Sequence, residues 1–205
     1  MNDPGEHYFS AAPSSDVSYE PVRARVWGHD LDLVSASGVF AHGRVDKGTA
    51  VLVAEAEPRA DVRTALDLGC GWGLLSIALA VHRPACEVWA VDVNERARAL
   101  TGENARRSGV ADRVHVVAPE DVPPDLSVDE IWSNPPIRIG KPAVHALLLR
   151  WLPVLGHAGR ALLVIGKNLG ADSYQRWLGE QGYGVVRVAS ANSFRVLEVR
   201  PRGAG

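Results

Sequence analysis

From residue 64 onward the chain alternates between short apolar runs and stretches of helical periodicity, and this alternation is its most constraining feature. The apolar runs are rich in Val, Ile and Leu, as strands buried on both faces usually are. Buried strands that alternate with helices form a parallel sheet with helices on both sides, so the sequence predicts a doubly wound α/β fold. The last two strands have no helix between them and are expected to form an antiparallel hairpin at one edge, which makes one edge strand antiparallel. The expected strands are 64–69, 87–93, 113–118, 130–133, 160–166, 183–190 and 193–200, and the expected helices are 74–82, 95–109, 143–155 and 172–182.

The first 60 residues have a different pattern. Residues 22–41 combine alternating apolar positions with β-branched residues and a turn signal at Gly28, so they predict short strands. Residues 46–58 predict a short helix that Pro58 ends. We therefore expect residues 1–60 to form an N-terminal β element with a lead-in helix, and residues 61–205 to form the main domain.

The composition suits one sizeable domain with a real core, because 46% of the 205 residues are hydrophobic. No apolar run reaches the length that spans a membrane, and the first residues are polar and acidic where a secretory signal would be basic and then apolar. These features predict a cytoplasmic protein without a membrane segment. Cys70 and Cys86 lack the spacing of a zinc site or a disulfide framework, and no pair of histidines has a metal-binding arrangement. We expect reduced, packed thiols and no metal.

The charges are distributed unevenly along the chain. The net charge is only −2, but 12 Lys and Arg against 21 Asp and Glu precede Ile131, about −9, and 10 against 3 follow from there, about +7. Such a skew can produce a basic surface that attracts phosphate groups, or folding can disperse it over the molecule. Both outcomes are open from the sequence.

A glycine-rich turn, "LDLGCGWG", follows the first of the buried strands. Gly69, Gly71 and Gly73 permit positive φ and let a ligand touch the backbone at the carboxyl end of the strand, where doubly wound sheets bind ligands. The next strand ends at Asp92, at about the interval where an acid accepts hydrogen bonds from a ribose in nucleoside-binding sheets. Asn94 can cap the following helix, which leaves Asp92 for this purpose. A nucleoside cofactor is the favoured interpretation.

The residues around the turn indicate which nucleoside. Asp67 stands two residues before the first glycine and would repel the pyrophosphate of a dinucleotide. An acid at this position suits a cationic amino acid, and S-adenosylmethionine carries an α-ammonium group and a sulfonium beside an adenosine. Asp121, after the third buried strand, stands where the adenine amino group could be accepted.

The stretch "WSNPPIRIGK" ends another buried strand at a corner with few hydrogen-bond donors. An exocyclic amine of a nucleobase is a poor nucleophile, and two acceptors on its N–H bonds would aim its lone pair at a methyl group. Asn134 can offer its side-chain oxygen and Pro135 its carbonyl, while Pro135 and Pro136 fix φ and supply no competing N–H. The corner therefore predicts catalysis by positioning at Asn134, Pro135 and Pro136, with no general base.

In this order and spacing, "DLGCGWG", "VDVN" and "SNPPI" resemble class I S-adenosylmethionine-dependent methyltransferases. The motifs "HYFSAAP", "GVFAHGRVDKGTAVLV", "GKNLGADS" and "FRVLEVR" are similar to those of the small-subunit ribosomal-RNA guanine-N2 methyltransferases, in particular their short single-domain forms. The resemblance implies a Rossmann-like, seven-stranded, mostly parallel sheet, and residues 61–205 as the methyltransferase domain. It implies methyl transfer to an amino group and ribosomal RNA, or the small ribosomal subunit, as partner. It places Asp67, Gly69 and Gly71 around the methionine moiety, Asp92 at the ribose, Asp121 at the adenine and Asn134 at the target amine. The expected cofactor-binding residues also include Cys70, Gly73, Val93 and Asn134.

The chain departs from this family in two places. Many amino-methylating relatives have an aromatic residue after the prolines, where its ring can stack on the base, and this chain has Ile137. Tyr8, Phe9 and Phe40 are the candidates to supply that ring. The larger relatives also carry a duplicated N-terminal domain for substrate recognition, and this chain is too short for one. We expect the substrate-binding residues to be Ile137, Arg138, Lys141 and Lys167, and the protein to be a monomer or weak dimer.

Two other functions remain open from the sequence. The Asn-Pro-Pro corner serves methyltransferases for other planar amines, such as an adenine amino group or a protein glutamine amide. A non-catalytic nucleoside-binding or RNA-binding domain is the third hypothesis, and the intact Asn134 and glycine turn argue against it.

Overall fold

The computed structural model describes residues 19–39 and 43–201. Its centre is a seven-stranded sheet in the order β5-β4-β3-β6-β7-β9-β8. The first five strands in this order are parallel to one another, which confirms the doubly wound prediction. The strands are β3 (Thr64–Leu68), β4 (Glu87–Val91), β5 (Val114–Val117), β6 (Val128–Ser133), β7 (Leu155–Gly166), β8 (Gly184–Ala191) and β9 (Phe194–Arg200).

The order of the strands creates one switch point. The chain runs outward from β3 through β4 to β5, then returns to place β6 on the other side of β3. The connections on the two sides of this point leave in opposite directions, so a crevice opens at the carboxyl ends of β3 and β6. The glycine turn after β3 and the Asn-Pro-Pro corner after β6 therefore become neighbours.

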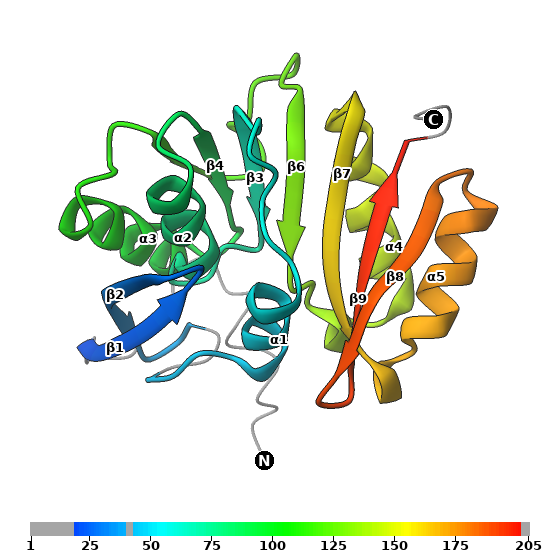
Figure 1. Ribbon diagram of the computed structural model, residues 1–205, viewed down its shortest axis with the longest axis horizontal. Coiled ribbons are helices and arrows are strands. Elements are labelled where there is room, and N and C mark those ends of the chain that lie inside the picture. The colour runs from blue at the N-terminus through cyan, green and yellow to red at the C-terminus, as the bar shows by residue number, and fades with distance from the viewer. Residues whose placement is uncertain (1–18, 40–42, 202–205) are drawn as a thin grey trace.

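The predicted antiparallel hairpin at the edge of the sheet is present, but the antiparallel strand is not the edge strand itself. β9 pairs antiparallel with both β7 and β8, so it lies inside the sheet and β8 forms the edge. The strand that runs against the parallel strands is therefore β9, one position in from the edge, and Figure 1 shows its arrow pointing opposite to that of β6.

Helices cover both faces of the sheet. One core contains buried side chains of α1 (Lys47–Glu55), α2 (Leu74–His82) and α3 (Glu95–Arg107), and the other contains those of α4 (Lys141–Trp151) and α5 (Ala171–Glu180). Neighbouring strand residues point to opposite faces: Trp132 belongs to the first core and Ile131 to the second. Residues 118–127 connect β5 to β6 as a loop instead of a helix. In Figure 1, α1 lies in front of the sheet and α4 behind it.

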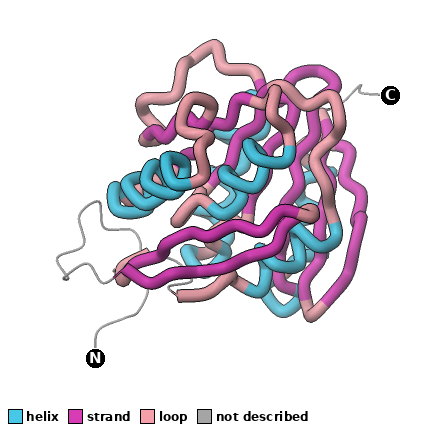
Figure 2. The backbone as a smooth tube through the Cα atoms, turned by 60° about the vertical axis from the view of Figure 1, so that its left-hand side comes forward, coloured by secondary structure: helices cyan, strands magenta, loops and turns pink. Residues whose placement is uncertain are grey.

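A separate two-stranded hairpin packs beside α2 and α3. It consists of β1 (Tyr19–Val26) and β2 (His29–Ala36), and the turned view of Figure 2 shows it running alongside the helices. Its buried residues belong to the first core. The buried side chain of Asn104 accepts from Val34 N at 2.8 Å and donates to Val34 O at 2.8 Å and to Trp72 O at 2.7 Å. One α3 residue thus ties the hairpin to the glycine turn.

Some element boundaries differ from the expected ones. α4 ends at Trp151 because a short 3-10 helix, η2 (Leu152–Val154), follows it, and β7 begins at Leu155 instead of residue 160. The early part of β7 is rich in small residues, which do not favour strands on their own. α1 ends at Glu55, before Pro58. Cys70 and Cys86 are free and buried, as expected. Within the described ranges, no helix is long and apolar enough to cross a membrane.

Candidate active site

The glycine turn after β3 leaves an open space at the carboxyl edge of the sheet. Gly69 and Gly71 have φ of 78° and 58°, and a Cβ on either would meet nothing within 4 Å. The backbone N–H groups of Gly69 and Cys70 donate to Val91 O at 2.8 and 3.1 Å, which pins the turn to the end of β4. Gly73 differs, because a Cβ there would lie 2.9 Å from Thr101 of α3. The first two glycines therefore leave room for a ligand, and the third allows α2 and α3 to approach.

Asp67 presents one unpartnered carboxylate oxygen below this turn. Its side chain is 1% exposed, and its Oδ2 accepts from the backbone N and the hydroxyl of Ser76 at 2.9 and 2.6 Å. Among the described residues, nothing donates to Oδ1. Burial raises the pKa of Asp67 to about 7. A buried oxygen without a donor is costly, so this atom fits a site that receives a donor from a ligand, and a cationic donor above all.

Asp92 holds the turn from the other side. Its two oxygens accept from Gly71 N at 3.0 Å and Asn94 N at 2.8 Å. Burial raises its pKa, while these backbone hydrogen bonds act in the opposite direction. Asn94 caps α3, as expected, by accepting from the backbone N–H groups of Arg96 and Ala97. Asp92 is therefore not the helix cap and lies directly at the glycine turn.

Two further residues expected at the cofactor lie farther along the same edge. Val93 follows Asp92 with 50% of its surface exposed, so an apolar side chain faces solvent beside a buried acid. Asp121 lies in the loop after β5 with its side chain exposed. The hollow at the glycine turn is lined by Asp46, Thr49, Asp67, Gly69, Cys70, Gly71, Trp72, Leu74, Leu75 and Asn134, so Asp92, Val93 and Asp121 are not among its walls.

The Asn-Pro-Pro corner contributes Asn134 to the lining of this hollow. The Asn134 amide nitrogen donates to Asp46 Oδ1 at 2.7 Å and to Thr49 Oγ1 at 3.1 Å. The carbonyl of Pro135 accepts from Ile137 N at 2.8 Å, so one of its two lone pairs is in use and one remains. The chain then continues as a 3-10 helix, η1 (Ile137–Ile139). The Asn134 oxygen is left by these contacts, whereas the Pro135 carbonyl already has one donor, Ile137 N, which the sequence did not predict.

The residues expected to bind substrate lie on the β6 and β7 side of the same edge. Arg138 in η1, Lys141 at the start of α4 and Lys167 in η3 (Lys167–Leu169) are exposed. Lys141 donates to Ser173 Oγ at 3.1 Å, close to the end of η3. Ile137 is half-buried and packs against the second core. The structure thus brings the three cations to one side of the corner.

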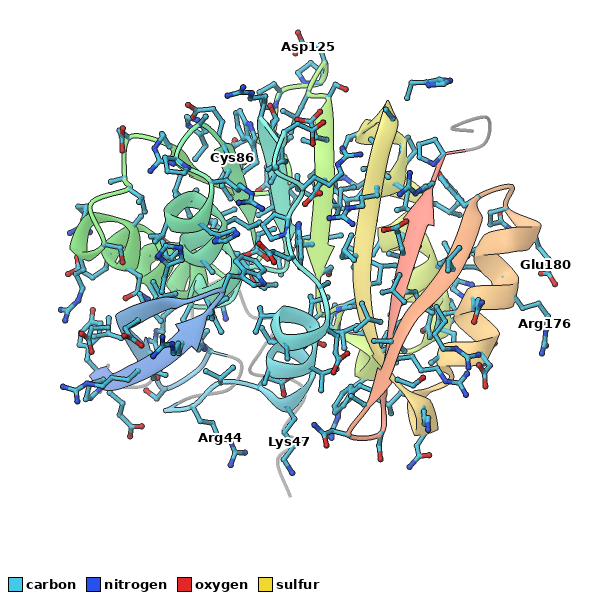
Figure 3. All side chains as sticks on the ribbon, viewed as in Figure 1. Arg44, Lys47, Cys86, Asp125, Arg176 and Glu180 are labelled. Carbon is cyan, nitrogen blue, oxygen red and sulfur yellow. The ribbon has the colours of Figure 1, made fainter. Side chains whose placement is uncertain are left out.

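Several residues of the site were not identified from the sequence. Asp46 and Thr49 contact Asn134, Ser76 contacts Asp67, and Asn104 ties the glycine turn to the hairpin. Asp46 and Thr49 lie in "VDKGT", part of the motif "GVFAHGRVDKGTAVLV", which predicts no role for either residue. Arg44 and Lys47 are exposed and project from the end of the molecule at which β6 ends (Figure 3). Tyr8, Phe9 and Phe40, the expected stacking residues, lie outside the described residues.

The sheet order with its inserted β9, the glycine turn and the Asn-Pro-Pro corner define an S-adenosylmethionine-dependent methyltransferase. The chain belongs to the methyltransferase small domain family, whose model matches residues 30–198.

Relatives and solved structures are similar over most of this chain. The protein YbxB of Bacillus subtilis is 34% identical over 171 residues, which cover 82% of this chain and 85% of YbxB. Ribosomal RNA small subunit methyltransferase C of Ectopseudomonas mendocina is 32% identical over 197 residues, which cover 93% of this chain and 57% of that protein. The structure of the 16S rRNA N2 G1207 methyltransferase of T. thermophilus, in complex with AdoMet and guanosine, has a TM-score of 0.77 at 22% identity and covers 94% of this chain and 53% of that one. The chain spans little more than half the length of these two ribosomal RNA methyltransferases.

Proposed function

We propose that this protein transfers a methyl group from S-adenosylmethionine to the exocyclic N2 amine of a guanine in small-subunit ribosomal RNA. The observation behind this proposal is the pair of hydrogen bonds that the Asn134 side chain makes within the protein. Both N–H bonds of its amide are taken up by Asp46 and Thr49, so its oxygen is the group left to accept from a substrate. An acceptor at this corner suits an amine as the methyl acceptor.

The residues around the glycine turn fit the cofactor. The unpartnered Oδ1 of Asp67 receives the α-ammonium group, and the open backbone at Gly69, Cys70 and Gly71 accommodates the methionine moiety. The carboxylate of Asp92 still has lone pairs for the ribose hydroxyls, since each oxygen has one recorded donor. The exposed apolar side chain of Val93 follows Asp92 and contributes to the same cofactor site, and Asp121 accepts from the adenine amino group.

The corner orients the target amine. S-adenosylmethionine supplies a methyl group on a cationic sulfur, so the amine lone pair forms the new N–C bond while the C–S electron pair stays with sulfur and the amine releases one proton to water. The amide oxygen of Asn134 and the remaining lone pair of Pro135 accept the two N–H bonds and direct the nitrogen lone pair at the methyl carbon. Pro136 contributes rigidity and no competing donor.

The exposed cations beside the corner bind the RNA backbone. Arg138, Lys141 and Lys167 are exposed on the β6 and β7 side of the edge, and Arg44 and Lys47 are exposed at the end of the molecule at which β6 ends (Figure 3). This arrangement puts positive charge where the phosphates of a flipped-out nucleotide would pass. The partner is ribosomal RNA or the small ribosomal subunit, and the protein acts as a monomer or weak dimer in the cytoplasm.

Methyl transfer assays test this proposal. Isotope-labelled S-adenosylmethionine is offered with deproteinised ribosomal RNA, with isolated small subunits and with a release factor that carries a target glutamine. We expect labelled N2-methylguanine in one of the two ribosomal substrates. Label in N6-methyladenine or in the release factor would contradict the guanine assignment and support another planar amine. Binding of S-adenosylhomocysteine without any transfer would support the non-catalytic function.

A further inference from the structure

The two ends of an asparagine amide have opposite properties, and only one end can serve the proposed reaction. The oxygen accepts hydrogen bonds and the nitrogen donates two. If Asn134 turned its nitrogen toward the target amine, donors would face donors and the lone pair would not be oriented. Something in the protein must therefore decide which end faces the hollow.

The hydrogen-bond partners of Asn134 determine the orientation of its amide. Asp46 offers a carboxylate oxygen 2.7 Å from the amide nitrogen, and an ionised carboxylate only accepts. With the amide turned over, two oxygens without a proton would lie at that distance. The Thr49 hydroxyl, at 3.1 Å, takes up the second N–H. Both hydrogen bonds of the Asn134 side chain within the described residues are made by its nitrogen, and Asn134 lines the hollow, so the oxygen is the end left for a ligand.

The first turn of α1 holds these two partners in place. Asp46 is its N-cap, and its Oδ1 also accepts from Gly48 N at 2.7 Å and Thr49 N at 3.2 Å. Gly48 leaves the space that the contact needs, because a Cβ there would lie 3.0 Å from Asp46 Oδ1, 3.2 Å from Asn134 Nδ2 and 3.1 Å from Phe194 Cε1. α1 itself packs on β7 and β9, so the sheet supports the contact.

We propose that Asp46 and Thr49 are positioning residues, which hold the amide of Asn134 with its oxygen toward the target amine. This inference rests on the proposed function and adds to it how the acceptor is oriented. It also gives "VDKGT" a physical role: the carboxylate selects the end of the amide, the glycine lets α1 approach, and the hydroxyl satisfies the second donor.

A different role for Asp46 would be to cap α1 and nothing more. The substitution Asp46→Ser separates the two roles, because serine is as good an N-cap as aspartate. Its hydroxyl is shorter, carries no charge and can donate, so it no longer selects the end of the amide. A second, matched pair is Thr49→Val, which removes the hydroxyl, and Thr49→Ser, which retains it.

The readout is single-turnover methyl transfer at saturating RNA and cofactor, measured together with the dissociation constant for S-adenosylhomocysteine and the melting temperature. For Asp46→Ser we expect a rate lower by about 10- to 100-fold, with the other two quantities near wild type. Thr49→Val should lose about 3- to 10-fold, and Thr49→Ser should recover most of that loss. In an Asn134→Ala background neither Asp46→Ser nor Thr49→Val should reduce the rate further, because the amide they orient is gone.

Three results would overturn the inference. A wild-type rate for Asp46→Ser would mean that Asp46 only caps the helix. Losses that multiply in the Asn134→Ala background would show that Asp46 and Thr49 act independently of the amide. A loss of cofactor affinity as large as the loss of rate would assign Asp46 to cofactor binding. These results concern the variants alone, whereas a wild-type protein that methylates no RNA would overturn the proposed function itself.

Discussion

The carboxyl edge of the sheet has two halves that are built differently. In the half formed by β3 and β4, the candidate site consists of an open glycine turn and two buried acids, Asp67 and Asp92, that are held by hydrogen bonds from Ser76, Gly71 and Asn94. In the half formed by β6 and β7, the site consists of one amide, Asn134, and exposed cations. The amide is held by a helix from far away in the sequence, and the cations have few contacts.

This difference separates two tasks. A buried, preformed half suits a small ligand that is the same in every turnover. An exposed half with long cationic side chains suits a polymer with a negatively charged backbone. If the two halves are independent, a change in one should leave the binding function of the other intact, and substitutions can test this directly.

The largest effect is expected for Asn134→Ala. In the proposed reaction the hydrogen bond from the target amine to Asn134 is needed in the transition state, so its loss should lower the single-turnover rate by about 10²–10³-fold. Affinity for S-adenosylhomocysteine and the melting temperature should stay close to wild type. Asn168→Ala, an exposed asparagine in η3 at the same edge, is the matched control. A rate close to wild type would make the Asn-Pro-Pro corner a strand terminator and nothing more.

The next largest effect is expected for Asp92→Ala. In the proposed complex Asp92 accepts from the ribose hydroxyls, and such charge-assisted hydrogen bonds contribute about 1.5–3 kcal/mol. The dissociation constant of S-adenosylmethionine, measured by calorimetry, should rise about tenfold or more, while RNA affinity stays unchanged. The exposed acid Asp112 supplies the control Asp112→Ala. Unchanged cofactor affinity in a folded Asp92→Ala protein would move the ribose away from this strand end.

A third prediction concerns pH. Burial raises the pKa of Asp67 to about 7, so in the free folded protein this carboxyl is mostly protonated at pH 6 and mostly ionised at pH 8. An ammonium ligand needs the ionised form, so cofactor affinity should rise up to about tenfold between these values. In Asp67→Asn, which can still accept from Ser76, this rise should disappear.

The raised pKa of Asp67 also predicts how the stability of the fold depends on pH. Because the folded pKa lies above the unfolded one, the contribution of Asp67 to stability is fully present below about pH 4 and is lost as pH rises toward 7. Chemical denaturation at pH 4 and pH 7 should show a smaller decline for Asp67→Asn than for wild type. An equal decline in both proteins would mean that Asp67 is already ionised at low pH.

The smallest effect is expected in the exposed half. Arg138→Ala or Lys141→Ala should weaken RNA binding a few-fold for all sequences and reduce the salt slope by about one. Cofactor affinity should not change. Arg176→Ala, which removes an exposed cation from α5, is the control (Figure 3). A slope identical to wild type would show that the charge skew of the sequence does not form an RNA surface.

Local patterns predicted the buried half well. The apolar runs gave the strands, Asn94 was expected to cap α3 and does so, and the glycines indicated an open turn beside Asp92. These features depend on neighbours in sequence, where propensity and spacing act directly. The orientation of Gly73 could not be predicted in this way. The spacing of the glycines does not reveal that Gly73 faces Thr101 and not the hollow.

The partners of Asn134 could not be predicted in the same way. Asp46 lies 88 residues earlier in the chain, and a capping aspartate on a short helix has no local feature that points to a distant amide. The bond of Asn104 to Val34, 70 residues away, is a second contact of this kind. Both depend on how layers pack, which a single sequence does not encode in its periodicity.

The position of β9 has a consequence for the order in which the enzyme becomes complete. β9 follows β8 in the chain, yet in the described sheet β8 reaches the other strands only through β9. In a nascent chain that ends at β8, this strand has no neighbour with which to pair. At that stage α1 also lacks β9, one of the strands on which it packs. The ring of Phe194, which lies against Gly48, also arrives with β9. The first turn of α1, which carries Asp46 and Thr49, therefore has its full support from the sheet only once residue 200 has been translated.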